Sequence, residues 1–152
     1  MKKILTFIVN EDNKILLLHN NPLDPIHGGD IWYTVTGGVE EFDRTLEDAV
    51  KREVKEETNL EVIDTMYLNI IFKYLNRQGI ECLEYVYISF IKDGSIILNE
   101  ENIGYKWLDI GEFIKQVYWY YDKEELINIL TEGINKELYY RKEVVRWQIL
   151  NI

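Results

Sequence analysis

The chain has 152 residues, of which 47% are hydrophobic and 13% aromatic, and its formal net charge is −10 at pH 7. This length supports one substantial hydrophobic core and is short for two, so we expect a single domain over residues 1–152. The acidic balance, with Lys and Arg scattered along the chain, argues against polymeric nucleic acid or an anionic membrane surface as a partner.

Cys82 is the single cysteine. It cannot form an internal disulfide, and a reducing, cytoplasmic location is therefore expected. The apolar run Ile4–Val9 is much too short for a signal core or a membrane span, and it predicts a strand.

The first predicted elements are strands. Ile4–Val9 and Ile15–His19 flank a polar turn and predict a hairpin. Residues 20–30 contain both prolines and two glycines and predict an irregular loop. A short strand is predicted at Ile31–Val35, running into a turn at Gly37 and Gly38.

A helix is predicted from Thr45 to Thr58, because the Thr45 hydroxyl can cap the first turn together with Asp48, three residues further on. The later elements are predicted from runs rich in β-branched and aromatic residues and from helical spacing. The predicted strands are Glu61–Leu75, Glu81–Phe90 and Gly104–Leu108, and the predicted helices are Ile110–Gln116, Lys123–Glu132 and Lys136–Trp147. Strands on both sides of a central helix predict an α/β fold, an α/β/α sandwich with a mixed central sheet.

Three glutamates of the central helix share its apolar face. At about 100° per residue, Glu56 and Glu57 lie within roughly 60° of Glu53, on the same side as the apolar residues of that helix. Burying three carboxylates together is costly unless a cation compensates them. A hard divalent ion that prefers oxygen ligands, Mg²⁺ or alternatively Mn²⁺, removes that cost, so the pattern predicts a metal site.

The segment from Gly38 to Leu60 resembles the Nudix box, G-x5-E-x7-R-E-U-x-E-E-x-G-U, in which U is aliphatic. Gly38 takes the first position, Arg52-Glu53-Val54 the R-E-U triplet, Glu56-Glu57 the paired glutamates and Leu60 the last aliphatic position. The resemblance, to the MutT-like members of the family in particular, implies the same α/β/α sandwich.

Two positions depart from that pattern. Asn59 replaces the second glycine, and asparagine is the usual second choice where a helix end needs a left-handed residue. Arg44 replaces the first glutamate, which normally adds negative charge beside the metal and pairs with the box arginine. Asp43, Glu47 or Glu41 could supply the missing charge from nearby.

The resemblance also implies roles for individual residues. Glu53 and Glu57 are expected to be the main metal ligands, Glu56 a further ligand or the base that activates water, and Gly37 a ligand through its carbonyl oxygen. Arg52 is expected to belong to the catalytic group by orienting Glu53. The family also uses an acid outside the box, for which Glu100 and Glu101 are the candidates; both also fit a solvated loop.

The implied reaction is metal-dependent cleavage of a phosphoanhydride bond in a nucleoside di- or triphosphate derivative. A small nucleotide or another diphosphate is the expected partner, and the chain is expected to be a monomer or a homodimer. Nearest in pattern are the oxidised-purine nucleoside triphosphatases, such as those acting on 8-oxo-dGTP, which the spacing of Trp107 and Trp119 weakly resembles.

Four residues are expected to bind substrate: Gly38, Arg44, Trp119 and Asp122. Rings in the run 118–121 could stack on a nucleobase while the Asp122 carboxylate reads its edge. Equally, these rings could simply pack under the C-terminal helices. Two other functions stay open: a module of weak or no activity that binds nucleotides or regulates, and a hydrolase of ADP-ribose or dinucleoside polyphosphates.

Overall fold

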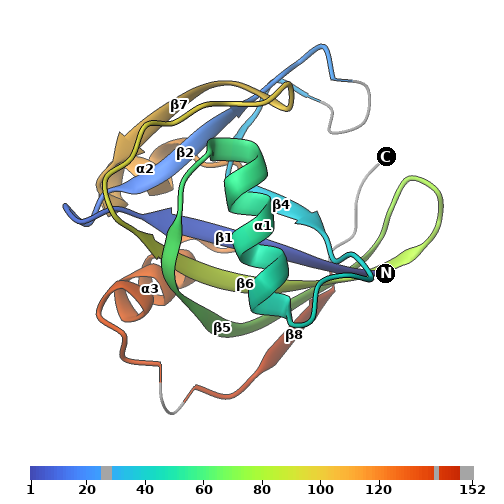
Figure 1. Ribbon diagram of the computed structural model, residues 1–152. Helices are drawn as coiled ribbons and strands as arrows, with labels where there is room; N and C mark the ends of the chain where they lie inside the picture. Colours follow the sequence, from blue (N-terminus) through green and yellow to red (C-terminus); the bar gives the residue numbers. More distant parts are fainter. Residues whose placement is uncertain (25–28, 139–140, 148–152) are drawn as a thin grey trace.

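The computed structural model describes residues 1–24, 29–138 and 141–147 (Figure 1). Its strands are β1 (Lys2–Val9), β2 (Ile15–Asn20), β3 (Trp32–Tyr33), β4 (Val35–Gly38), β5 (Val62–Leu75), β6 (Glu81–Ile91), β7 (Asn102–Leu108) and β8 (Val144–Trp147). Its helices are α1 (Leu46–Thr58), α2 (Ile110–Gln116) and α3 (Lys123–Ile134).

Within the described residues all strands belong to one sheet, in the order β3-β2-β1-β6-β5-β8. β4 pairs with β1 and β7 pairs with β2, both antiparallel. The β1–β6 and β5–β8 pairs are parallel, so the sheet is mixed, as the sequence predicted. β1 is the central strand of this arrangement because it pairs with β2, β4 and β6.

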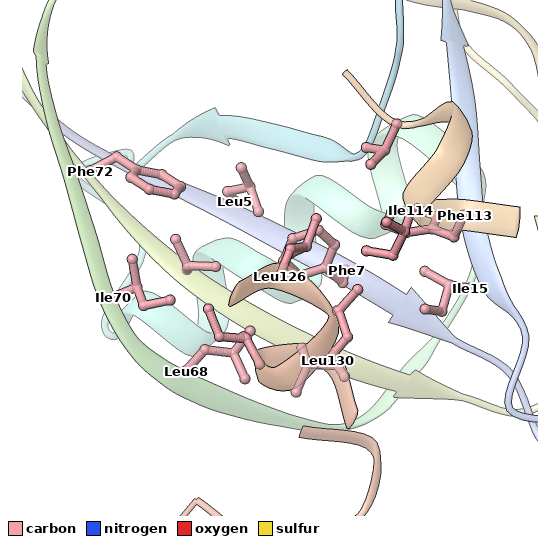
Figure 2. Close-up of a cluster of buried hydrophobic side chains, with 14 of the residues drawn as sticks. Leu5, Phe7, Ile15, Leu68, Ile70, Phe72, Phe113, Ile114, Leu126 and Leu130 are labelled. Atoms are coloured by element: carbon pink, nitrogen blue, oxygen red, sulfur yellow. The ribbon is translucent and has the colours of Figure 1, made fainter. Parts of the chain in front are cut away.

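The side chains of β1 alternate between two hydrophobic cores, one on each face of the sheet. Ile4 and Ile8 pack with Ala49, Val50 and Val54 of α1. The opposite core, which lies under α2 and α3, includes Leu5 and Phe7 of β1 together with Phe113, Leu126 and Leu130. Figure 2 shows Leu126 and Leu130 of α3 beside Phe7 on this second face. The α/β/α sandwich is therefore confirmed.

The predicted helix over Lys136–Trp147 is wrong. Helix α3 ends at Ile134, and Lys136 has a left-handed backbone with a φ of 57°, which stops further helical turns. Val144–Trp147 forms strand β8 against β5, where its two β-branched residues fit the pleated edge. The predicted strand Ile31–Val35 is also interrupted, since β3 ends at Tyr33 and β4 begins at Val35. No helix in the described part of the chain is long and apolar enough to cross a membrane.

Candidate active site

Helix α1 begins and ends where its sequence predicts. The Thr45 side chain accepts a hydrogen bond of 3.1 Å from the Asp48 amide and caps the N-terminus. At the other end Asn59 takes a left-handed conformation, with a φ of 66°, and its backbone N–H donates a hydrogen bond to the Lys55 carbonyl. These two caps define which residues of the helix face the sheet.

Glu53 projects from α1 directly onto Gly37 at the end of β4. A Cβ atom built at Gly37 would lie 2.0 Å from the Glu53 carboxyl carbon, so only glycine leaves room for this carboxylate. The Glu53 side chain is 12% exposed. Burial raises the pKa of Glu53 to about 7, while the hydrogen bond and charge of Arg52 act in the opposite direction. The Glu53 carboxylate therefore packs directly against the main chain at Gly37.

Glu57 lies deeper, one helical turn further on, with 5% exposure. Its Oε1 atom accepts a hydrogen bond of 3.3 Å from the Asn102 side-chain amide, and Oε2 is buried with no hydrogen-bond partner among the described residues. Burial, followed by the negative charges of Glu101 and Glu53, raises the pKa of Glu57 well above its ordinary value. A carboxylate oxygen that is buried without a hydrogen bond costs folding free energy, and a bound cation would offset this cost.

Arg52 ties the turn before α1 to the glutamates. Its Nη1 atom donates to Glu53 Oε1 at 3.0 Å and to the Glu56 carboxylate at 3.3 Å. Its Nη2 atom donates to the Gly38 carbonyl at 2.8 Å and to Asp43 Oδ2 at 2.9 Å, and Nε donates to Asp43 Oδ1 at 3.1 Å. These hydrogen bonds from the rigid guanidinium restrict the orientation of the Glu53 carboxylate.

Asp43 supplies the carboxylate that position 44 lacks. Its side chain is 3% exposed, and besides Arg52 it accepts the Glu40 amide at 2.8 Å. The hydrogen bond from Arg52 is the main cause that holds the pKa of Asp43 below its usual value. Arg44 is exposed and makes no ion pair or hydrogen bond with any described residue. Of the three substitutes considered from sequence, Asp43 is the one that pairs with the box arginine.

The other acidic candidates lie at different depths. The Glu56 side chain is 54% exposed and contacts Arg52. The charge of Glu101 contributes to the raised pKa values of both Glu53 and Glu57, whereas Glu100 is exposed. Asn102, which the sequence did not single out, joins the site from β7 through Glu57.

The donor set fits a hard divalent ion, although the ligands are not gathered in advance. Among the described residues, no three His, Cys, Asp or Glu side chains form a ready metal-binding group. The orphaned Glu57 Oε2 and the buried Glu53 carboxylate beside the Gly37 main chain are the groups that such an ion would compensate. Arg52 Nη1 bridges Glu53 and Glu56 and holds positive charge between them.

Trp119 and Asp122, predicted to bind substrate, lie away from α1. Trp119 packs in the core under α2 and α3, with ring centroids 5.8 Å from Phe7 and 5.5 Å from Phe72. Asp122 caps helix α3 by accepting the Glu124 amide at 2.9 Å. These contacts give both residues a structural role, and their contact with substrate stays a prediction.

A Nudix domain model matches residues 2–128 of the chain. The chain therefore belongs to the Nudix family, and it is a pyrophosphohydrolase of that family. It is 25% identical over 116 residues to an uncharacterized Nudix hydrolase, YvcI, of Bacillus subtilis, a match that covers 74% of this chain and 68% of that protein.

Solved structures share the fold. The dihydroneopterin triphosphate pyrophosphohydrolase of E. coli is 24% identical with a TM-score of 0.66, covering 88% of this chain and 95% of that one. A Nudix hydrolase from Listeria monocytogenes is 23% identical with a TM-score of 0.67, covering 92% and 97%. The MutT protein of Methanosarcina mazei is 18% identical with a TM-score of 0.66, covering 90% and 94%.

Proposed function

We propose that the chain is a divalent-cation-dependent hydrolase that cleaves the pyrophosphate linkage of a nucleoside di- or triphosphate. The observation that carries this proposal is the buried Glu57 carboxylate, whose Oε2 atom has no hydrogen-bond partner in the part of the chain that the structure describes, beside Glu53 packed on Gly37. Two buried carboxylates that lack full compensation are the donors that Mg²⁺ or Mn²⁺ takes.

Glu53, Glu57 and the Gly37 carbonyl would hold the cation, and Glu56 would be either a further ligand or the base that activates water. When bound, such an ion neutralises phosphate charge and activates water for attack. Glu56 is the most exposed of the three glutamates and is our candidate for taking the proton of the attacking water. Arg52 keeps Glu53 oriented and withholds its own charge from substrate, because its donors are engaged by protein oxygens.

Arg44 is our candidate for binding the phosphates. It lies in the segment between Gly38 of β4 and Leu46 of α1, exposed and without a carboxylate partner in the described residues. A guanidinium in that state is available for bidentate contact with phosphate. The pairing of Arg52 with Asp43 supports this role, because Asp43 provides the partner of Arg52 that the first box glutamate usually provides, and position 44 is not needed for it.

The test is a panel of nucleoside diphosphates and triphosphates, oxidised-purine triphosphates, ADP-ribose and dinucleoside polyphosphates, each with Mg²⁺, with Mn²⁺ and with EDTA. We expect release of phosphate or pyrophosphate that EDTA abolishes, with nucleoside triphosphates among the substrates. Turnover restricted to ADP-ribose or dinucleoside polyphosphates would overturn the substrate class. Binding without turnover of any compound would overturn the hydrolase and leave a nucleotide-binding module.

A further inference from the structure

Glu84 is a buried carboxylate that the metal chemistry does not use. It lies on β6 with 5% exposure, on the face of the sheet opposite to α1, two residues before Val86 of the core under α2 and α3. An ionised group in such a place needs compensation.

The protein compensates only one side of this carboxylate. The Tyr74 hydroxyl donates to Glu84 Oε2 at 3.1 Å, and the Lys3 ammonium is 4.0 Å from the same oxygen. Oε1 receives no hydrogen bond from any described residue, and this oxygen is not fully enclosed by protein atoms. A buried carboxylate oxygen that receives no hydrogen bond from the protein can accept one from a ligand.

The strand register places this carboxylate in line with the turn before α1. Gly38 of β4 pairs with Lys3 of β1, and Lys3 pairs with Glu84 of β6, so the three residues share one face of the sheet. Two strand spacings, about 10 Å, separate Gly38 from Glu84. A Cβ atom at Gly38 would meet nothing within 4 Å, so the surface beside Lys3 is open. The Gly38 carbonyl itself is bound by Arg52, which links this face to the metal side.

Tyr33 of β3 stands between this carboxylate and two exposed rings. The negative charge of Glu84 adds to burial in raising the pKa of Tyr33 well above its ordinary value. The Tyr118 backbone amide donates to the Trp32 carbonyl at 2.8 Å, so Tyr118 lies beside β3. Tyr118 and Tyr120 are 41% and 50% exposed, and their rings pack edge to face with centroids 4.7 Å apart. Exposed rings beside β3, together with a buried acceptor near Tyr33, suit a planar, polar heterocycle.

We propose that Glu84 reads the base of the nucleotide by accepting two parallel N–H groups, and that the ligand is a 2-amino-6-oxopurine or a heterocycle with the same edge. This deepens the proposed function and rests on it. A carboxylate only accepts hydrogen bonds, and it has room for four. Guanine presents adjacent N1–H and 2-amino donors, whereas adenine and cytosine place an acceptor beside their amino group and uracil offers one donor.

The test compares GTP, ITP and ATP on the wild type, on Glu84→Gln and on the control Glu81→Gln. ITP lacks only the 2-amino group. Glu81 lies on the same strand in an exposed ion pair with Lys73, so its replacement repeats the chemical change away from the site. We expect the wild type to prefer GTP over ITP by at least about tenfold in kcat/KM, as for a lost bidentate partner.

Glu84→Gln should abolish that preference and raise ATP relative to GTP, because an amide offers one acceptor and one donor, which matches adenine. Glu81→Gln should keep the wild-type ratios. Equal rates on GTP and ITP in the wild type, or an unchanged ratio in Glu84→Gln, would overturn the role of Glu84 while leaving hydrolysis established. Absence of turnover would overturn the proposed hydrolase function but not the role of Glu84. In that case the dissociation constants of non-hydrolysable analogues of the three nucleotides test whether the protein still prefers guanine.

Discussion

Asp43 and Arg52 form a two-pronged ion pair, with Oδ1 3.1 Å from Nε and Oδ2 2.9 Å from Nη2. The family pattern assigns the partner of this arginine to the next position, which here is Arg44. Moving the carboxylate by one residue keeps the guanidinium in place, and with it the orientation of Glu53. The departure in the box is thus compensated within the same turn.

Asp43→Asn should lower kcat about tenfold or more, comparable to the loss of a side chain that orients a metal ligand. The asparagine amide keeps the shape of the side chain, but one of the two oxygens that accept from the Arg52 guanidinium becomes an NH₂ donor. Arg52 then loses a hydrogen bond that holds it to residue 43. Steady-state kinetics against Mg²⁺ concentration measures the effect. Glu41→Gln, at an exposed neighbour, is the matched control. Adding Arg44→Glu to Asp43→Asn should recover part of the activity, and full activity of Asp43→Asn alone would contradict the ion pair's role.

Replacing either buried glutamate of α1 should remove turnover. Glu53→Gln and Glu57→Gln keep the side-chain shape but remove a charge and a hard ligand, so we expect kcat to fall by at least about two orders of magnitude. Thermal unfolding and isothermal titration with Mg²⁺ separate loss of metal from loss of fold. Full turnover by both variants, or activity that EDTA leaves intact, would refute the metal site.

Much of this arrangement was accessible from the sequence, because it rests on local signals. The cap at Thr45, the left-handed Asn59 and the shared face of Glu53 and Glu57 all follow from helical periodicity and capping chemistry. Asn102 and Glu84 could not be found that way. Their significance arises from pairings across the sheet, with Glu57 and with Lys3 and Tyr74, which no spacing along the chain encodes. Strand β8 was missed because its register depends on β5, which lies far away in sequence.

Arg44→Glu tests the freed guanidinium. We expect weaker nucleotide binding and a lower kcat/KM, because the variant places a negative charge where the phosphates are proposed to lie. Titrations of Mg²⁺ and of nucleotide against both proteins give the two affinities separately. A variant that binds Mg²⁺ more tightly and is faster at every metal concentration would instead mark Arg44 as a defect in the metal surroundings.

Trp119→Ala distinguishes packing from base recognition. The contacts with Phe7 and Phe72 lead us to expect a loss of about 3 kcal/mol in the free energy of unfolding, typical of a large aromatic removed from a core. Denaturant unfolding measures it. If Trp119 also stacks on a nucleobase, nucleotide binding weakens by about 1–3 kcal/mol while cleavage of a base-free pyrophosphate compound is unchanged. An equal loss on both kinds of substrate leaves packing as its role.

The stability contribution of Glu84 should depend on pH. Burial is the main cause that raises the pKa of Glu84 above its ordinary 4.5, against the opposing influence of Lys3 and Tyr74. A carboxyl with a raised folded-state pKa contributes stability that is complete below the unfolded pKa and is lost as pH rises through the folded value. Glu84→Gln mimics the neutral form, so it should gain stability relative to wild type as pH rises above 4.5. Urea unfolding across this range checks the trend, which a constant difference would contradict.

Cys82 adds a practical consequence. It is the single thiol of the chain, it is 1% exposed, and it pairs across the β5–β6 hairpin with Tyr74, the residue that holds Glu84. A thiol reacts with an alkylating reagent only when it reaches solvent, so the labelling rate of the native protein reports how often this part of the sheet opens. The molecule therefore carries its own probe of that opening, two residues from Glu84, without an introduced label.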